Sequence, residues 1–469
     1  MTARSLEDLL QAAKSPVEML RNSQAGPNAY PGVQPEYTNW RDEQQAWQNT
    51  CVLFNQSYHM ADLALEGPDA LKLLTHLGTN SFANFPRNRA KQFAPVTPEG
   101  YVIGDVILFH LDDGTFNLVG RIPVLNWVMF HAETGGFNVK ATLDQRTALR
   151  TDGKRKAYRF QVQGPNAMSV IEKAIGGTTP PELKFFHITQ LTIAGKKVGA
   201  LRHGMAGQPG WELFGPWEDY GAVHEALVRA GEEFGMRLVG GKAYSSNTLE
   251  SGWIPSPLPA IYSGESLKAY REWLPADGYE ARASIGGSFV SSKIEDYYFT
   301  PWDLAYDSFT RFDHDFIGRD ALEKKAKDNH RKKVTLALVD EDVTATIGSL
   351  FGNKGANRAK FMDWPSAVYS MHPFDKVSAN GKTVGVSTWI GYSSNEGKML
   401  TLAVLDEDFA QPGREVVFTW GEENGGTSKP TVEKHSQKEI RAIVSPVPYV
   451  ETVRKEYAPA GGWREATAG

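Results

Sequence analysis

The stretches LALEGPDALKLL (63–74) and RFQVQGPNAMSVIEK (159–173) share one pattern, and together they decide the expected fold. In each, the alternating apolar residues of a strand end at Gly-Pro, and apolar residues three and four positions apart begin just after it. This change of period predicts a strand, a tight turn and a helix. Gly67 and Gly164 lie 97 positions apart, by subtraction of their numbers. The repetition suggests two related α+β subdomains, although two unrelated units would give the same pattern.

The rest of the chain indicates more than one domain. At 469 residues it is too long for one ordinary hydrophobic core, so two or three domains are expected. Further strands are predicted at 101–111, 115–122, 191–203 and 211–216, and helices at 37–50, 122–134 and 217–235. Near residue 330 the pattern changes to short strands separated by turns. We therefore expect two α+β subdomains within residues 1–330 and a β-barrel-like domain over residues 331–469.

Charge and composition argue against several classes of protein. The formal net charge is −5 at pH 7, and no clustered basic face offers a nucleic acid the contacts it needs. Cys51 is the only cysteine, so the chain has neither an internal disulfide nor a CxxC pair for zinc. Residues 1–21 are read as an amphipathic helix rather than a signal peptide, and no apolar run is long enough to span a membrane. We expect a cytoplasmic protein without metal, nucleic-acid, membrane or obligate protein partners.

Common catalytic motifs are absent, and isolated polar residues in apolar surroundings are the remaining candidates. The sequence has no phosphate loop, zincin helix, nucleophile elbow or dinucleotide fingerprint. Asp105 in YVIGDVILFHL is costly to bury unless a partner or ligand faces it, although it could also lie on the solvent face of a strand. Arg121, at a strand end, could bind a carboxylate or be an ordinary surface arginine.

Two further polar residues could meet a ligand. His59 lies among polar residues in FNQSYHMADL, where a structural role is the more common outcome. Glu212 follows a glycine-rich turn in HGMAGQPGWELFGP, and its carboxylate could accept two parallel N–H bonds from an amidine-like ring edge.

The stretch AYSSNTLESGWIPSPLPAIY (243–262) combines polar residues and prolines with large apolar side chains. A surface linker is often proline-rich, but it does not usually carry Leu249, Trp253 and Ile261 as well. Prolines fix φ and remove backbone donors, so they can hold the chain rigidly. We interpret this stretch as one wall of a site.

Blocks of the sequence resemble the aminomethyltransferase (T-protein) family of the glycine cleavage system over nearly the whole chain. They include LEGPDALKLL, TPEGYVIGDVILF, LRHGMAGQPGWELFGP, NTLESGW and DHDFIGRDAL, in the same order as in that family. The resemblance implies a tetrahydrofolate-binding protein with a three-domain, cloverleaf-like fold. Where that family carries two arginines, this chain has Tyr244 and Thr248, which disfavours aminomethyl transfer from a lipoyl group.

A closer resemblance is to the tetrahydrofolate-dependent aryl O-demethylases of bacterial lignin catabolism, which act on vanillate, 3-O-methylgallate or syringate. It is carried by YTNWRDEQQAW, RHGMAGQPG, SNTLESGWIPSPLPAIY and IGGSFVSSKIEDYY. It implies transfer of the ether methyl group of a methoxylated benzoate to N5 of tetrahydrofolate. A phenolate leaves poorly unless it is hydrogen-bonded as its charge develops. Tyr244 can supply that bond, with an ordinary pKa of about 10 that is close to a phenol's.

The resemblance also implies the site residues and their roles. Arg121, Tyr30 and His59 would hold the polar groups of the benzoate, Glu212 the amino edge of the pterin, and Asp105 the region of the folate ring nitrogens. The expected catalytic residues are Tyr244 and His59, the expected substrate-binding residues are Arg121, Tyr30, His59, Gln56 and Trp253, and the expected folate-binding residues are Glu212, Asp105, Gln56 and Trp253.

Two other functions stay open on the sequence alone. A folate-linked enzyme that demethylates a sulfonium or an amine, or transfers an aminomethyl group, would need an aromatic cage or an acidic group rather than a cation. A non-enzymatic folate-binding regulator would bind the folate and turn nothing over. Neither the preference among the three benzoates nor the oligomeric state can be read from the sequence.

Overall fold

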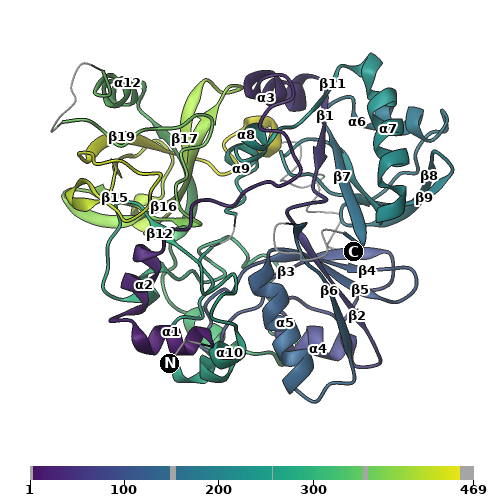
Figure 1. Cartoon of the computed structure of the whole chain (residues 1–469), viewed down its shortest axis with the longest axis horizontal. Helices are drawn as coiled ribbons and strands as arrows, with labels where there is room; N and C mark the ends of the chain where they lie inside the picture. Colours follow the sequence, from purple (N-terminus) through teal and green to yellow (C-terminus); the bar gives the residue numbers. More distant parts are fainter. Residues whose placement is uncertain (1–3, 148–154, 256, 352–356, 455–469) are drawn as a thin grey trace.

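The computed structural model describes residues 4–147, 155–255, 257–351 and 357–454. Three lobes surround a common centre: two sheets, each covered by helices, and a closed barrel (Figure 1). The expected α+β class, with a mostly β C-terminal part, is confirmed. Among the described residues, no helix combines the length and the apolar character needed to cross a membrane.

The first lobe is a five-stranded antiparallel sheet in the order β3-β4-β5-β2-β6. Its strands are β2 (Ala61–Glu66), β3 (Arg89–Phe93), β4 (Val106–His110), β5 (Phe116–Gly120) and β6 (Lys140–Asp144). Two helices, α4 (Ala70–Leu77) and α5 (Ile122–Thr134), lie together against this sheet (Figure 1). The apolar residues of α5 are buried along its length, and the helix matches the predicted range 122–134.

The second lobe is a six-stranded sheet in the order β11-β1-β7-β10-β9-β8, with helices α6 (Ala167–Ala174) and α7 (Tyr220–Gly231) on its outer face (Figure 1). Its strands are β1 (Cys51–Asn55), β7 (Ala157–Gln163), β8 (Ile188–Ile193), β9 (Lys196–Arg202), β10 (Gly210–Pro216) and β11 (Met236–Leu238). Only the pair β1–β11 is parallel among its described strands. This lobe has a buried apolar cluster of its own.

The predicted strand, Gly-Pro turn and helix occur in both lobes, as β2–α4 and β7–α6. Gly67 has φ 127° and Gly164 has φ 126°, backbone conformations that residues with a side chain rarely adopt. A Cβ atom at Gly67 would lie 2.5 Å from the carbonyl oxygen of Asn138, and one at Gly164 would lie 2.6 Å from that of Thr50. The same backbone constraint therefore fixes both turns. Whether the two subdomains are related stays a prediction.

Several sequence-based boundaries were wrong. The range 101–111 is not one strand, because Gly104 has φ 156° and pairing begins only at Val106, which leaves Asp105 in the loop before β4. The range 191–203 spans two strands, because Ala194 and Gly195 form a left-handed turn that reverses the chain between β8 and β9. The helix expected at 217–235 is present over 217–234, with short 3₁₀ segments, Trp217–Asp219 and Glu232–Phe234, at the two ends of α7.

The third lobe is a closed antiparallel barrel in the order β13-β17-β16-β15-β18-β19. Its strands are β13 (Lys332–Leu338), β15 (Asp375–Ala379), β16 (Lys382–Ser393), β17 (Lys398–Leu405), β18 (Glu415–Trp420) and β19 (Lys438–Ser445). Apolar side chains fill its interior, and closure leaves no unpaired strand edge. The domain boundary near residue 330 stays a prediction.

The remaining elements connect the lobes. They are α1 (Leu6–Ala12), α2 (Pro16–Asn22), α3 (Trp40–Asn49), α8 (Gly241–Tyr244), α9 (Asn247–Ser251), α10 (Lys268–Trp273), α11 (Arg319–Lys325), α12 (Asp340–Gly348), β12 (Ile285–Gly286) and β14 (His372–Pro373). The single N-terminal helix expected over residues 1–21 is instead two helices, because Ser15 and Pro16 start a new one with its own cap. The predicted helix at 37–50 is α3, which begins three residues later than expected.

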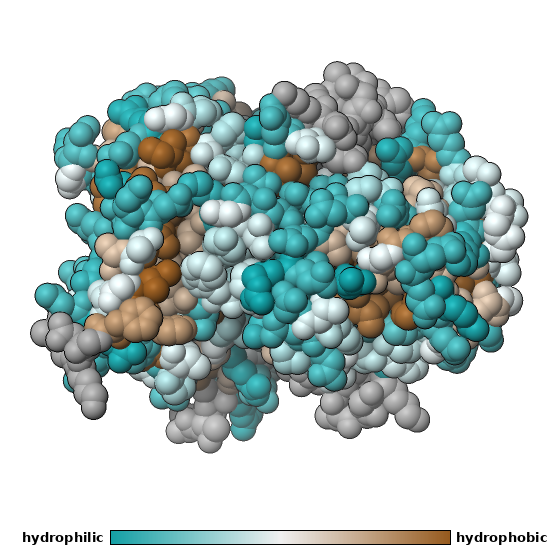
Figure 2. All heavy atoms as spheres, turned by 90° about the horizontal axis from the view of Figure 1, so that it is seen from above, coloured by the Kyte–Doolittle hydropathy of each residue, from teal (hydrophilic) through white to brown (hydrophobic). Residues whose placement is uncertain are grey.

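The first sheet and the barrel share one hydrophobic core. The largest apolar cluster runs from the first sheet through residues 254–316 to the barrel strands β16 and β17. On the face drawn in Figure 2, hydrophilic side chains surround several separate hydrophobic areas. The first sheet and the barrel therefore share their packing, whereas the second sheet packs mainly on its own helices.

We expect Gly164→Ala to lower the midpoint of thermal unfolding, because its Cβ atom would clash with backbone atoms and its φ would be strained, at a cost of about 1–3 kcal/mol. The matched control is Gly221→Ala in α7, where nothing lies within 4 Å of the added atom. That control should be neutral or stabilising, because alanine favours helices over glycine. Circular dichroism of both variants tests this, and equal midpoints would contradict the constraint.

Candidate active site

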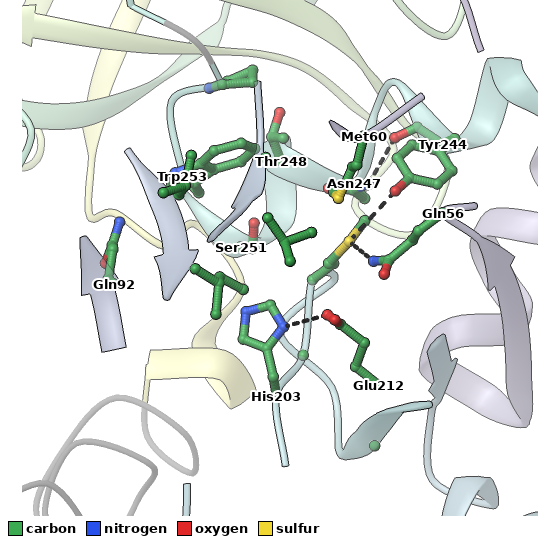
Figure 3. A pocket seen from close by; sticks show the side chains of 18 of the residues that line it. Gln56, Met60, Gln92, His203, Glu212, Tyr244, Asn247, Thr248, Ser251 and Trp253 are labelled. Carbon is green, nitrogen blue, oxygen red and sulfur yellow. Dashed lines mark hydrogen bonds and ion pairs between the residues drawn. The ribbon is translucent and has the colours of Figure 1, made fainter. Parts of the chain in front are cut away.

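A cavity of about 540 Å³ lies between the first sheet, the second sheet and the α8–α9 stretch. Figure 3 shows side chains from these elements converging on it. The cavity is lined by every residue that the sequence analysis selected: Tyr30, Gln56, His59, Asp105, Arg121, Glu212, Tyr244 and Trp253. The structure thus brings the whole set together, while the role of each residue stays a prediction. A volume of this size falls in the range of small-molecule sites.

Tyr244 lies at the centre of an aromatic group in the cavity. Its ring is 4.6 Å from the ring of Tyr30 and 4.8 Å from that of His59. Its hydroxyl donates to Sδ of Met205 at 3.5 Å, and the amide of Gln56 donates to the same sulfur (Figure 3). A thioether is a weak acceptor. The hydroxyl therefore keeps its capacity for a stronger bond to a ligand oxygen.

The acidity expected for Tyr244 was wrong for the free protein. Burial, together with the nearby Tyr30 and Glu212, raises the pKa of Tyr244 well above its ordinary value. The group is therefore a weaker acid than a free phenol. It holds its proton at neutral pH and acts as a hydrogen-bond donor.

His59 is a neutral side chain in this cavity. Burial and the positive charges of Arg121, Arg146 and Arg155 lower the pKa of His59 to about 3. Its Nδ1 atom is buried and has no hydrogen-bond partner among the described residues. A buried polar atom of this kind costs free energy until it finds a partner. His59 can thus exchange a hydrogen bond with a ligand without carrying charge.

Asp105, in the loop just before β4, accepts hydrogen bonds from three side chains. Its oxygens accept from Gln92 Nε2 at 2.9 Å, Trp253 Nε1 at 3.1 Å and Tyr306 Oη at 2.9 Å. Burial nevertheless raises the pKa of Asp105 above its ordinary value. The residue is neither an exposed strand position nor an unpaired charge, and the bond from Trp253 ties it to the opposite wall.

Glu212 belongs to a buried chain of charges that joins the two sheets. Arg159 on β7 donates to Glu212 on β10 at 2.5 Å and to Asp62 on β2 at 2.8 Å. The guanidinium also lies over the rings of Phe109 and Phe214, with distances of 4.9 and 5.2 Å to the ring centres. Burial alone raises the pKa of Glu212, but Arg159 and His203 outweigh it and bring the pKa below its ordinary value. Glu212 is thus a buried carboxylate held in the charged form.

Of the two oxygens of Glu212, Oε2 makes the weaker contact with the protein. Its Oε2 lies 3.6 Å from Nδ1 of His203, beyond a normal hydrogen bond (Figure 3). Both oxygens of Glu212 are predicted to accept N–H bonds from the ring edge of a ligand, but Oε1 already accepts from Arg159. Glu212 therefore offers a ligand one largely uncommitted oxygen.

Apart from Ser256, which lies outside the described residues, the stretch 243–262 forms one wall of the cavity through α8, α9 and the residues after them. Tyr244, Thr248 and Trp253 line the cavity. Glu250 points away from it and accepts hydrogen bonds from Trp47 of α3 and Ser393 of β16, each at 2.7 Å. The stretch is therefore a structural wall, held from behind by its own carboxylate.

Sequence reasoning missed several residues of the site. They are Gln92, Arg146, Arg159, His203, Met205, Tyr279 and Tyr306. Arg159 had a usable signal, because a cation inside the alternating strand RFQVQ needs a partner for the same reason as Arg121 does. Met205 and Tyr306 had none, because their contacts depend on segments far apart in the chain.

The GCVT N-terminal domain family matches residues 14–256 of the chain. The chain belongs to the GCVT family. A member of the family, the syringate O-demethylase of Sphingobium sp. (strain NBRC 103272 / SYK-6), is 60% identical over 99% of this chain and 100% of its own length. The sesamin methylene transferase of Sinomonas sp. (strain No.22) is 27% identical, and the match covers 82% of each protein.

The expected T-protein fold is also supported by a solved structure. The aminomethyltransferase T of the glycine cleavage system of Bartonella henselae superposes with a TM-score of 0.60. The match covers 92% of this chain and 95% of that one, with 19% sequence identity. This chain thus shares the fold of that protein.

We expect Arg159→Met to destabilise the protein by about 3–5 kcal/mol, because it leaves the buried carboxylate of Glu212 without its cation. Arg229→Gln is the matched control, since Arg229 is exposed and pairs only with Glu225 on the same helix. Thermal unfolding followed by circular dichroism should show a large loss for the first variant and little change for the second. Equal stability of the two variants would contradict a structural role for the buried chain of charges.

Proposed function

We propose that this protein is a tetrahydrofolate-dependent O-demethylase that acts on syringate. The observation that carries the proposal is the 60% identity to a syringate O-demethylase over 99% of this chain and 100% of that one. The shape and chemistry of the cavity support it. Vanillate and 3-O-methylgallate are related methoxylated benzoates, and the assay below includes them as competitors. The single cysteine, Cys51, fits the cytoplasmic location that we assign to the enzyme.

The cavity suits two flat ligands of different charge. Asp105 and Glu212, which can accept N–H donors, face tetrahydrofolate in this proposal, and its pterin amino edge meets the free oxygen of Glu212. Arg121 and His59 face the benzoate. Holding both rings in one pocket removes much of the entropy cost of bringing two substrates together. Gln56 and Trp253 line the space between the two ligands.

The reaction moves one methyl group between the two substrates. The bond from the methyl carbon to the ether oxygen breaks, and a bond from the same carbon to N5 of tetrahydrofolate forms. The departing oxygen keeps the electron pair, and N5 gives up its proton. The products are the phenol and 5-methyltetrahydrofolate, so atoms and charges balance.

Tyr244 stabilises the departing oxygen in this scheme. Its raised pKa keeps the hydroxyl protonated, so it can donate to the phenolate oxygen as negative charge develops there. In a buried site a donor of this kind is worth about 2.7–4 kcal/mol of transition-state stabilisation. The proton that ends on the phenol comes from N5, and Tyr244 holds the oxygen until it arrives.

The first test is a direct assay of the protein with tetrahydrofolate and syringate, vanillate or 3-O-methylgallate. We expect the demethylated phenol and 5-methyltetrahydrofolate to form in equal amounts from syringate, as measured by chromatography. Tetrahydrofolate bound without any product would favour a regulator. Methyl transfer only from sulfonium or amine donors would favour a different one-carbon enzyme.

The second test is Tyr244→Phe, which removes only the hydroxyl. We expect turnover to fall by about 100-fold or more, with binding of syringate and tetrahydrofolate nearly unchanged, because the bond strengthens mainly in the transition state. Isothermal titration and single-turnover rates separate the two effects. Tyr297→Phe is a matched control, since Tyr297 is buried but lies outside the cavity. Near-normal turnover in Tyr244→Phe would show that another group stabilises the departing oxygen.

A further inference from the structure

Two guanidinium groups meet at one end of the cavity without an acidic partner. Arg121 precedes α5 and Arg146 follows β6, and both line the cavity. Among the described residues, no carboxylate forms an ion pair with either of them. By contrast, the nearby Arg155 and Arg159 are both paired with Asp62. The first two arginines are therefore positive charges of the cavity that no described carboxylate compensates.

Arg146 is only partly satisfied by the protein. Its Nη2 donates to the backbone oxygen of Ala29 at 3.1 Å, and its Nε is buried without a hydrogen-bond partner in the part of the chain that the structure describes. Burial and the charge of Arg121 lower the pKa of Arg146, against the opposing effect of Tyr279. Both arginines are half-buried, and two like charges held near each other and partly away from water are costly. An anion placed between them would relieve that cost and supply the missing acceptor.

Asp105 lines a small adjoining pocket with Arg121 and Tyr279, and the other groups at this end are hydrogen-bonding side chains. Burial raises the pKa of Tyr30, and the positive charges of Arg121 and Arg146 oppose that rise. The same two charges act with burial to lower the pKa of His59. Tyr279 lines the same end, and its hydroxyl donates to Asn28 at 3.4 Å. These side chains would complete the coordination of a small planar anion without neutralising its partners. The carboxylates of Asp105 and Glu212 each have a donor set of their own.

We propose that Arg146 and Arg121 form a two-guanidinium clamp for the carboxylate of an aromatic acid, in which Arg146 selects acids over uncharged rings. The inference rests on the proposed function, because it assigns the benzoate to this end of the cavity. Guanidinium groups pair with carboxylates through two parallel hydrogen bonds, so the clamp fixes the ring as well as the charge. The ring contacts among Tyr30, His59 and Tyr244 place the clamp next to the expected departing oxygen.

A simpler role for Arg146 would be to hold the backbone at Ala29 and so to position Tyr30. That role predicts weaker binding of every ring that packs on Tyr30. The clamp predicts weaker binding only where the ligand carries a carboxylate. The two roles therefore separate when one ligand differs from another by the carboxylate alone.

The experiment measures binding of syringate and of 2,6-dimethoxyphenol, the same ring without the carboxylate, by isothermal titration without tetrahydrofolate. In Arg146→Gln we expect the Kd for syringate to rise by about 10- to 100-fold, as for loss of a charged hydrogen bond. The Kd for 2,6-dimethoxyphenol should change by less than about threefold, and Arg146→Lys should recover part of the loss for syringate. Arg229→Gln, on the exposed surface of α7, should bind both ligands like the wild type.

Equal weakening of both ligands, or unchanged binding of syringate, would overturn the clamp. If the wild type demethylates syringate and Arg146→Gln binds it normally, the clamp alone is wrong. If syringate binding depends on Arg146 but no methyl group is transferred, the clamp stands and the proposed function is wrong.

Discussion

The buried guanidinium of Arg159 is the interaction on which the cavity depends. It comes from β7 and binds Asp62 of the first sheet and Glu212 of its own sheet, while two phenylalanine rings cover its faces. A buried cation requires such partners, and the partners require the cation in turn. The side chain therefore joins the two sheets, together with the backbone hydrogen bonds that Asn88 and Ala90 form with Ile188 and Phe186. The cavity between the sheets takes its shape from these contacts.

Charges of both signs line the cavity. Arg121 and Arg146 form no ion pair with a described carboxylate, whereas Glu212 on the second sheet is a carboxylate held in the charged form by Arg159. An anionic ring and a ring that donates N–H groups would thus each meet complementary charge at different residues. Electrostatic complementarity of this kind contributes more to specificity than to affinity.

The sequence was most informative where local backbone chemistry controls structure. Both Gly-Pro turns, helix α5 and the change to short strands after residue 330 follow from period and turn residues, and the structure has all of them. Errors arose where one residue changes the backbone direction, as at Gly104 and Ala194. Periodicity cannot detect such a residue, since the apolar pattern continues on both sides of it.

The site was predicted by resemblance more than by pattern. Every residue selected from the sequence lines the cavity, but spacing alone could not have grouped Tyr30 with Tyr244. The partners of these residues were missed, because Arg159, Met205 and Tyr306 reach them through contacts between distant segments. Such contacts are set by the assembled lobes and leave no local signal in the chain.

The carboxylate of Glu250 has a consequence for how small this protein can be made. Its hydrogen-bond donors come from α3, through Trp47 and Gln48, and from the barrel, through Ser393 and Asn395. Deleting the barrel would remove the two donors to Oε1 and leave that oxygen without them behind the wall. It would also remove the side chains of β16 and β17 from the apolar core that the barrel shares with the first sheet. The barrel thus supports the wall of the cavity from behind. A truncated protein made of the two sheets alone would lose that support.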